Sequence, residues 1–224
     1  MTINAENYRN FPAVSNSDLS KLLSLSISNK RVMDLTYAYA MGTLIDVMIT
    51  EPERVNYFKN TVSGEAYRYT KEDFGIAMKM RDSFYKDEFC RSLISHCNFQ
   101  HISYNPEFKL EWDGIKFTIP AKCKWDLISR IVDFGGDIKS TTATTEQQCR
   151  AAMRYFDYDR SRAWYMDLEG RNNDMLIFIS KVNYKIFKIP ITRDSEIYKS
   201  GKMKYLELAH KWHYLFGQSN QNIF

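Results

Sequence analysis

The chain has 224 residues, of which 44% are hydrophobic and 26% are charged, and its formal net charge is +4 at pH 7. This length and composition fit one large globular domain. The balance of 31 basic against 27 acidic residues permits nucleic-acid binding without requiring it. No apolar stretch reaches the roughly 18 residues that a membrane span needs, which excludes an integral membrane protein.

The N-terminal stretch "MTINAENYRNFP" has neither the basic start nor the apolar run of a secretory signal, so we expect a cytoplasmic location. The cysteines Cys90, Cys97, Cys123 and Cys149 are then expected to be reduced thiols. No C-x-x-C pair occurs among them, which argues against a zinc or iron–sulfur site.

The first 95 residues are predicted to be mainly helical. Ser15 with Asp18 three residues later has the pattern of a capping box and begins the first helix. A second helix is predicted over residues 34–50, before a proline. A third helical region is predicted over 70–93, with Asp73 completing another capping box.

The hydrophobic period then changes to that of strands. "FKLEWDGIKFTI" alternates apolar and polar residues on both sides of Asp113-Gly114, which indicates a hairpin. The segments "KCKWDLI", "RIVDF" and "GDIKST" are predicted as three further short strands.

The C-terminal third returns to helix over about residues 145–167, with a break near Asp157. "DMLIFISK" and "YKIFKIPI" predict another strand pair, and residues 193–217 an amphipathic helix. With a sheet core at 98–190, this order predicts a single domain over 1–224 of mixed α/β (α+β) class, built on one central sheet.

Two acids and a lysine stand in or beside the predicted strands. Asp126 follows one strand-like run, and Asp137 begins another eleven residues later, with Lys139 on the same face two positions on. Buried charges need partners. Two carboxylates can hold Mg²⁺, and a lysine beside the ion can help to activate a metal-bound water, as phosphodiester hydrolysis requires. The competing interpretation of the triplet is an edge-strand salt bridge, because D-x-K occurs often by chance.

The stretch "KCKWDLI…RIVDFGGDIKSTT" resembles the core motif of the PD-(D/E)XK nuclease superfamily, in which one strand carries an acid and the next an acid-x-lysine. It is most similar to the RecE-type (exonuclease VIII-like) and YqaJ-like phage exonucleases. In the same order along the chain, "FPAVSNSDLSKLL" resembles the serine-bearing helix start of that group. "AMGTLIDVMITEPE" resembles its G-x-x-x-H segment, and "YFDYDRSRAWYMD" its Q-x-x-x-Y helix.

This resemblance implies a restriction-endonuclease-like core, a central mixed sheet flanked by helices, with an N-terminal helical region. It implies a metal-dependent deoxyribonuclease that uses Mg²⁺, or Mn²⁺ as a substitute, and acts as an exonuclease in phage or mobile-element recombination or DNA processing. The partners implied are DNA, a single-strand annealing protein and further copies of the chain in a ring. The location implied is the cytoplasm of a bacterial or phage-infected cell.

Transferred residue by residue, the resemblance makes Asp126 and Asp137 metal ligands and Lys139 the catalytic lysine. The backbone carbonyl of Ile138 would also face the metal, and Tyr165 matches the tyrosine beside the active site.

Two positions depart from the family pattern. Asp46 stands where the family commonly has a metal-contacting histidine, and we interpret it as a substitute ligand, although an exposed helix position is the alternative. Ser161 stands in place of the glutamine of Q-x-x-x-Y, and Arg160 or Arg162 is the candidate for its contact to a phosphate or carboxylate.

Four further residues are candidates for contact with a DNA backbone. Ser15 and Ser17 start a helix and would lie near a phosphate, unless they serve only as caps. Lys122 and Lys124 alternate along the strand that leads to Asp126, where they would steer phosphates or form ion pairs.

Two other functions stay open at this point. Because of the departures at Asp46 and Ser161, the chain could be a catalytically degenerate nuclease-like module that binds DNA or a protein. In the other alternative the acid–lysine pairs are structural, which predicts Asp126 and Asp137 far apart, or paired with lysines and without room for an ion.

Overall fold

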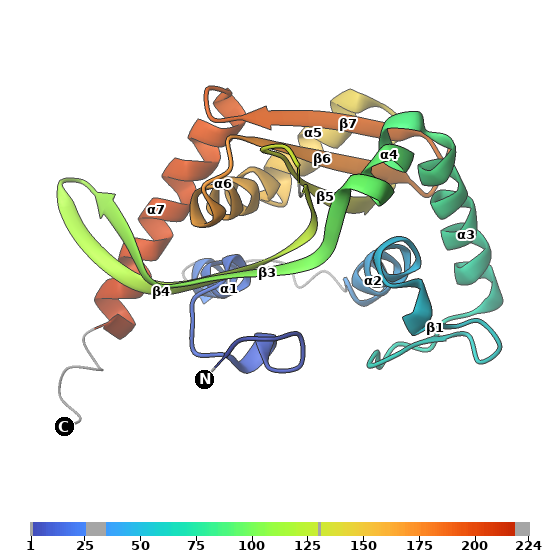
Figure 1. Ribbon diagram of the computed structural model, residues 1–224, viewed down its shortest axis with the longest axis horizontal. Coiled ribbons are helices and arrows are strands. Elements are labelled where there is room, and N and C mark those ends of the chain that lie inside the picture. Colours follow the sequence, from blue (N-terminus) through green and yellow to red (C-terminus); the bar gives the residue numbers. More distant parts are fainter. Residues whose placement is uncertain (1, 26–34, 130, 218–224) are drawn as a thin grey trace.

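The computed structural model describes residues 2–25, 35–129 and 131–217, and a five-stranded mixed sheet of order β3-β4-β5-β6-β7 forms its centre (Figure 1). The strands are β3 (Cys97–Trp112), β4 (Ile115–Ser129), β5 (Gly135–Thr141), β6 (Asn173–Ser180) and β7 (Ile186–Thr192). Only β5 and β6 pair in parallel, and the other neighbours are antiparallel. The predicted mixed sheet with flanking helices is therefore confirmed.

Helices precede the sheet, interrupt it once and close the chain. The N-terminal group is α1 (Asn16–Leu25), α2 (Thr36–Thr50), α3 (Lys71–Lys86) and α4 (Glu88–His96), with the short turns η1 (Tyr8–Asn10) and η2 (Pro52–Arg54). A small hairpin of β1 (Val55–Asn56) and β2 (Thr61–Val62) follows η2. The later helices are α5 (Glu146–Tyr155), α6 (Tyr158–Glu169) and α7 (Glu196–Phe216). None of the helices in the described part of the chain is both long and apolar enough to span a membrane.

The helix starts follow the predicted capping chemistry. Ser15 and Asp18 exchange hydrogen bonds before α1, and Thr70 and Asp73 form a full capping box at α3. The single helical region predicted over 70–93 is instead two helices, because the side chain of Asp87 caps a new helix by accepting from Cys90 N. The predicted start at residue 34 lies outside the described residues.

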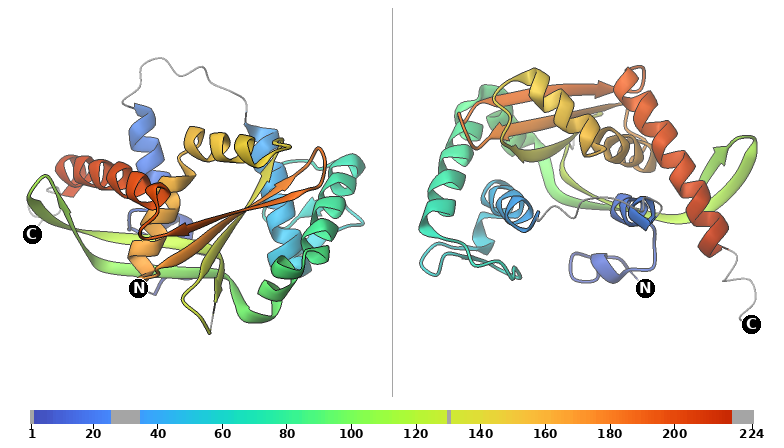
Figure 2. Two further views of the ribbon diagram at one scale, coloured as in Figure 1. Left: turned by 90° about the horizontal axis from the view of Figure 1, so that it is seen from above. Right: turned by 180° about the vertical axis from the view of Figure 1, so that it is seen from behind.

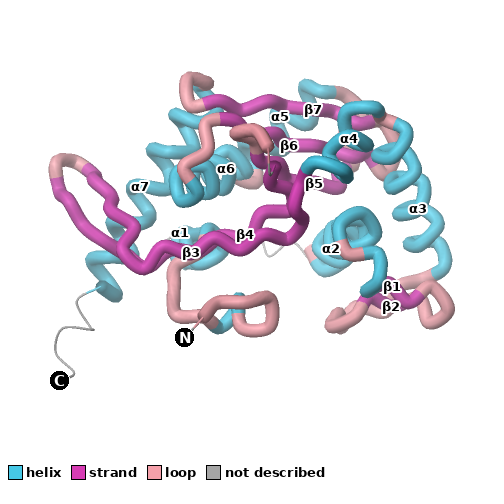
Figure 3. Tube along the Cα trace, viewed as in Figure 1, coloured by secondary structure: helices cyan, strands magenta, loops and turns pink. Residues whose placement is uncertain are grey.

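The strands β3 and β4 form a long hairpin that extends beyond the rest of the sheet (Figure 3). Asp113 (φ 49°) and Gly114 (φ 76°) form its two-residue turn, as the sequence indicated. The segment "KCKWDLI" is not a separate strand but the second half of β4. The predicted strand "RIVDF" is wrong, because residues 131–134 form the bend that joins β4 directly to β5. Its first residue, Arg130, is not described.

The parallel pair β5–β6 is connected by α5 and α6, which lie with α7 on one face of the sheet (Figure 2). Strand β6 is buried on both faces. Leu176 and Phe178 pack into the cluster formed with α6 and α7, whereas Ile177 and Ile179 pack toward α3 and α4. Because Asp137 is in register with Leu176, the acid-x-lysine of β5 faces the α6 side.

Close packing at the start of β5 requires glycine. A Cβ at Gly135 would lie 2.0 Å from Cζ3 of Trp125, which is completely buried on β4. The bare backbone of Gly135 therefore allows β5 to lie against β4 over the indole ring.

We expect Gly135→Ala to lower the free energy of unfolding by about 1–3 kcal/mol, because Trp125 has no space to move. The control is Gly75→Ala in α3, where an added Cβ meets nothing within 4 Å, and which should stabilise by about 0.5–1 kcal/mol. Guanidinium denaturation followed by circular dichroism measures both. Equal effects of the two substitutions would contradict the packing argument.

Candidate active site

The two predicted acids lie where β4 and β5 separate. These strands pair only through Leu127 with Gly136 and Ile128 with Gly135, and then diverge. The side chain of Asp126 enters the gap, and its Oδ2 accepts a hydrogen bond from Ile138 N at 2.9 Å. Burial, with the nearby Asp46 and Asp137 carboxylates, raises the pKa of Asp126 well above its ordinary value. The sheet therefore places a carboxyl group, whose charged form burial disfavours, at the point where β4 and β5 separate.

Ile138 presents its backbone to the same gap. Its N–H points at Asp126, and in an extended strand the carbonyl of a residue points to the same edge as its N–H. The side chain of Ile138 packs on the other side of the sheet, with the cluster around α3 and α4. The main-chain oxygen is thus available on the side where the sequence resemblance assigns a ligand.

Asp137 is held by two cations. Its Oδ1 accepts a hydrogen bond from Arg162 Nη1 at 2.9 Å, and its Oδ2 forms a close ion pair with Lys139 Nζ. The Lys139 ammonium also lies 5.3 Å from the ring centroid of Tyr158. Burial acts to lower the pKa of Lys139, but the carboxylates of Asp137 and Asp126 raise it above its ordinary value. Lys139 is therefore charged and lies between the acids.

Asp46 reaches the same place from α2. Gln100 Nε2 donates to both carboxylate oxygens, at 3.2 and 3.1 Å, and the Thr50 hydroxyl donates to Oδ1 at 3.3 Å. Burial raises the pKa of Asp46 to about 6, against the opposing effects of Lys139 and of the Gln100 hydrogen bonds. The carboxylate is therefore turned inward and held, not exposed on a helix surface as in the alternative interpretation.

Sequence reasoning missed Gln100. It lies in β3 opposite Asp126, between the paired residues Phe99 and His101, and its own backbone is left-handed with φ 52°. A non-glycine residue in this region of φ costs on the order of 1 kcal/mol or more and is concentrated at functional sites. A single glutamine in a strand carries no sequence signal of this role.

Asp174 was also missed, and it explains the position of Arg162. The Arg162 side chain is fully buried, and its Nε donates to Asp174 Oδ2 at 2.6 Å while Nη1 holds Asp137. Its guanidinium lies 4.7 Å from the Trp125 ring centroid and 4.5 Å from that of Tyr165. Of the two contacts expected for Arg162, it therefore makes the one to a carboxylate, and its full burial rules out the one to a DNA phosphate.

Tyr165 does not line the pocket, and its ring contacts Trp125 and the Arg162 guanidinium. Its ring packs edge-on against Trp125 at 5.4 Å, and burial raises the pKa of its hydroxyl well above the ordinary value. Ser161, at the position of the family glutamine, donates its hydroxyl to the Tyr158 carbonyl. Tyr165 is thus placed to support Arg162.

Two further basic residues expected at phosphates are used within the fold. Lys122 is 3% exposed, and its ammonium donates to the carbonyls of Tyr8 and Phe11 at 2.7 and 2.8 Å. Arg160 is 2% exposed and donates to Asn16 and Ser20 of α1. Both expectations of DNA contact are corrected, because each cation is enclosed by protein acceptors.

The remaining phosphate candidates differ in exposure. Ser15 is buried and serves as the cap of α1, whereas Ser17 is exposed. Lys124 is half-buried on β4, and its charge acts on Asp46, which places it near the acids.

Asp46 and Asp126 line a pocket of about 500 Å³ together with Ile138 and Lys139. Residues of α2, α5 and α6 also line it, whereas Asp137 does not. Hard carboxylate oxygens and a neighbouring carbonyl fit a Mg²⁺ site. A bound cation would favour the charged carboxylates of Asp46 and Asp126, whose pKa values are raised by burial and by the neighbouring acids. Across residues 2–25, 35–129 and 131–217, no three His, Cys, Asp or Glu side chains are already grouped about one metal position. Shared coordination thus requires side-chain movement, and Asp137 is held by Lys139.

The comparisons with known proteins support the fold. No family model and no curated protein matches the sequence. The crystal structure of a "Putative exonuclease" from Eubacterium rectale matches with a TM-score of 0.63 and 16% identity, over 95% of this chain and 86% of that one. The chain therefore shares the fold of that protein, as the sequence resemblance predicted.

Two other structures match with lower scores. A phage related exonuclease from Haemophilus somnus has a TM-score of 0.41 and 14% identity, over 92% of this chain and 96% of that one. An alkaline exonuclease from Laribacter hongkongensis has a TM-score of 0.34 and 13% identity, over 97% and 99%. TM-scores this low do not establish a shared fold, so the fold assignment rests on the Eubacterium rectale structure.

Gln100→Leu is expected to raise the pKa of Asp46 above about 6, because the two hydrogen bonds that favour the charged carboxylate are lost. Carbon-13 NMR titration of the aspartate carboxyl groups measures this shift. Asn98→Leu, at an exposed position of the same strand, is the control and should leave the titration unchanged. An unchanged or lower Asp46 pKa in Gln100→Leu would refute the role given to Gln100.

Proposed function

We propose that this chain is a Mg²⁺-dependent deoxyribonuclease that hydrolyses phosphodiester bonds of DNA. The observation that carries the proposal is that Asp46 of α2 and Asp126 of β4 line an open pocket together with Lys139, and that Asp137 of β5 pairs with this lysine close enough to act electrostatically on both acids. Salt bridges alone do not explain this arrangement, because the acids outnumber the lysine and two of them have raised pKa values.

Each group has a role in this proposal. Asp46, Asp126, Asp137 and the Ile138 carbonyl would hold the ion, which when bound supplies an acidic water and neutralises charge on the phosphate. Lys139, which is charged, contributes a positive charge at the scissile phosphate and hydrogen-bond donors that orient the attacking water.

The surrounding residues hold this geometry. Arg162 fixes one oxygen of Asp137 and leaves the other toward Lys139, and Gln100 fixes Asp46. Asp46 thus takes the position of the family histidine as an anionic ligand.

The finer features of the proposal come from the sequence resemblance. They are exonuclease action in phage or mobile-element recombination or DNA processing, a single-strand annealing partner, a ring of several copies, and a cytoplasmic location in a bacterial or phage-infected cell. The fold shared with the Eubacterium rectale protein supports the coarser part, a nuclease-like protein.

A second candidate is a nuclease-like module that binds DNA or protein without cutting. One observation favours it: both oxygens of Asp137 are engaged by the cations Arg162 and Lys139. In this alternative the ion pair replaces the metal permanently.

We expect Asp137→Asn and Lys139→Met each to reduce cleavage of linear DNA in Mg²⁺ or Mn²⁺ by at least about 100-fold, because each removes a charge at the reacting phosphate. Gel assays with single- and double-stranded substrates measure the rate. Lys199→Ala, on the surface of α7, is the matched control and should cleave like the wild type. Wild-type rates of DNA cleavage in either site variant, or no cleavage by the wild type, would contradict the proposal.

Calorimetric titration with Mn²⁺ separates the two candidates. The wild type is expected to bind the ion, and Asp126→Asn, which preserves side-chain size, is expected to weaken binding by about 10-fold or more. A wild type that binds no Mn²⁺, or binds it independently of Asp126, would favour the non-cutting module.

A further inference from the structure

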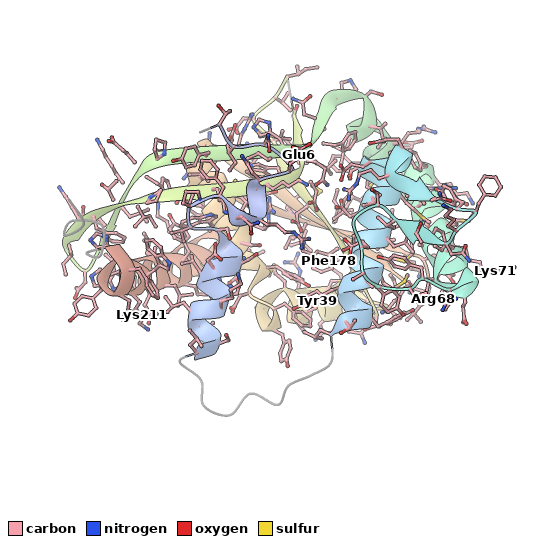
Figure 4. The ribbon with its side chains drawn as sticks, turned by 90° about the horizontal axis from the view of Figure 1, so that it is seen from below. Glu6, Tyr39, Arg68, Lys71, Phe178 and Lys211 are labelled. Atoms are coloured by element: carbon pink, nitrogen blue, oxygen red, sulfur yellow. The ribbon has the colours of Figure 1, made fainter. Side chains whose placement is uncertain are left out.

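The pocket continues outward from Lys139 along a wall of aromatic side chains. Tyr39 of α2, Phe156 between α5 and α6, Tyr158 of α6 and Phe178 of β6 all line it. Figure 4 shows the labelled Tyr39 and Phe178 close together beside α2. The wall thus combines side chains that are far apart in the sequence, and it lines the same pocket as Asp46 and Asp126.

Two of these rings are exposed although they lie in a recess. Tyr39 is 70% exposed and Phe156 is 44% exposed. The Phe156 ring stacks on Tyr158 at 5.6 Å with an interplanar angle of 24°, and the hydroxyl of Tyr39 acts electrostatically on that of Tyr158. Two exposed rings that line an open pocket offer aromatic surface to a ligand.

A cation stands at the rim of the same wall. Lys181 lines the pocket, and its ammonium lies 4.8 Å from the ring centroid of Tyr37. Among the described residues no carboxylate forms an ion pair with Lys181, whereas Lys139 and Arg162 both pair with Asp137. Partial burial also lowers the pKa of Lys181. An ammonium without an acidic partner, beside exposed rings, suits a phosphate.

We propose that this wall is a nucleotide subsite, in which Tyr39 and Phe156 stack the base of one unpaired nucleotide and Lys181 contacts its phosphate. The inference rests on the proposed function, because it places that nucleotide next to the phosphodiester at Lys139. A volume of about 500 Å³ is within the roughly 300–1,000 Å³ of small-ligand pockets. Stacking on side chains requires the base to leave its own duplex stack, so the nucleotide taken is single-stranded.

The test compares binding of a fluorescein-labelled thymidine 12-mer with that of a 12-mer of the same backbone without bases. Fluorescence anisotropy is measured in Ca²⁺ in place of Mg²⁺, so that no cleavage is needed. The wild type should bind the thymidine oligomer at least about 5-fold more tightly, from base–aromatic stacking. Tyr39→Leu and Phe156→Leu should each reduce this ratio and leave binding of the base-free oligomer unchanged.

Two further variants sharpen the result. Lys181→Met should weaken binding of both oligomers by the same factor and reduce its salt dependence. Phe58→Leu, a fully exposed ring in the β1–β2 turn, is the control and should change neither oligomer. Variants at Tyr39 and Phe156 that keep the wild-type ratio overturn the subsite, as does a wild type that binds neither oligomer.

The outcome is separable from that of the proposed function. Cleavage in Mg²⁺ with an unchanged ratio refutes the subsite and leaves the nuclease activity in place. A ratio that depends on Tyr39 and Phe156 without any cleavage supports the subsite and refutes the nuclease.

Discussion

The buried guanidinium of Arg162 is the interaction on which the rest of the structure depends. It joins α6 to β5 and β6 through Asp137 and Asp174, and packs against the rings of both Trp125 and Tyr165, which also contact each other. Buried charges of this kind are tolerated only as a complete set, since loss of one partner leaves another charge uncompensated at a cost of about 3–5 kcal/mol. Gly135 contributes to the same cluster. Its bare backbone packs closely on the indole ring of Trp125, and this ring in turn contacts the Arg162 guanidinium.

This arrangement also decides what Asp137 can do. With one oxygen held by Arg162, the other pairs with Lys139, which lines the pocket. Asp46 is held in a similar way by Gln100, whose left-handed backbone stores strain beside the acids. The raised pKa values of Asp46 and Asp126 show that the fold accepts crowded carboxylates there, which is a cost in stability that a functional site explains.

The features that the sequence predicted well are those that depend on neighbours in the chain. The Asp113-Gly114 turn, the capping box at Thr70 and the helix break at Asp157 all follow from local backbone and hydrogen-bonding preferences. The prediction failed at "RIVDF", where a short apolar run has the composition of a strand but no neighbouring edge to pair with. A DNA contact was wrongly expected for Lys122, because a basic residue in a pattern carries no information on which carbonyls will surround it. Arg160 makes the carboxylate contact that was its alternative, to Asp157.

The sequence by itself identified Asp126, Asp137 and Lys139 as candidate site residues, put Lys139 on the same face as Asp137, and predicted the mixed sheet that carries them. It could do so because strand period and residue spacing are local properties. Only the tertiary structure decided that β4 and β5 separate at Asp126, that Asp46 turns inward toward Gln100, and that Arg162 binds Asp137 instead of a phosphate. These contacts join residues 25 to 54 positions apart in the chain. Their geometry follows from how helices pack on a twisted sheet, which no spacing along the chain encodes.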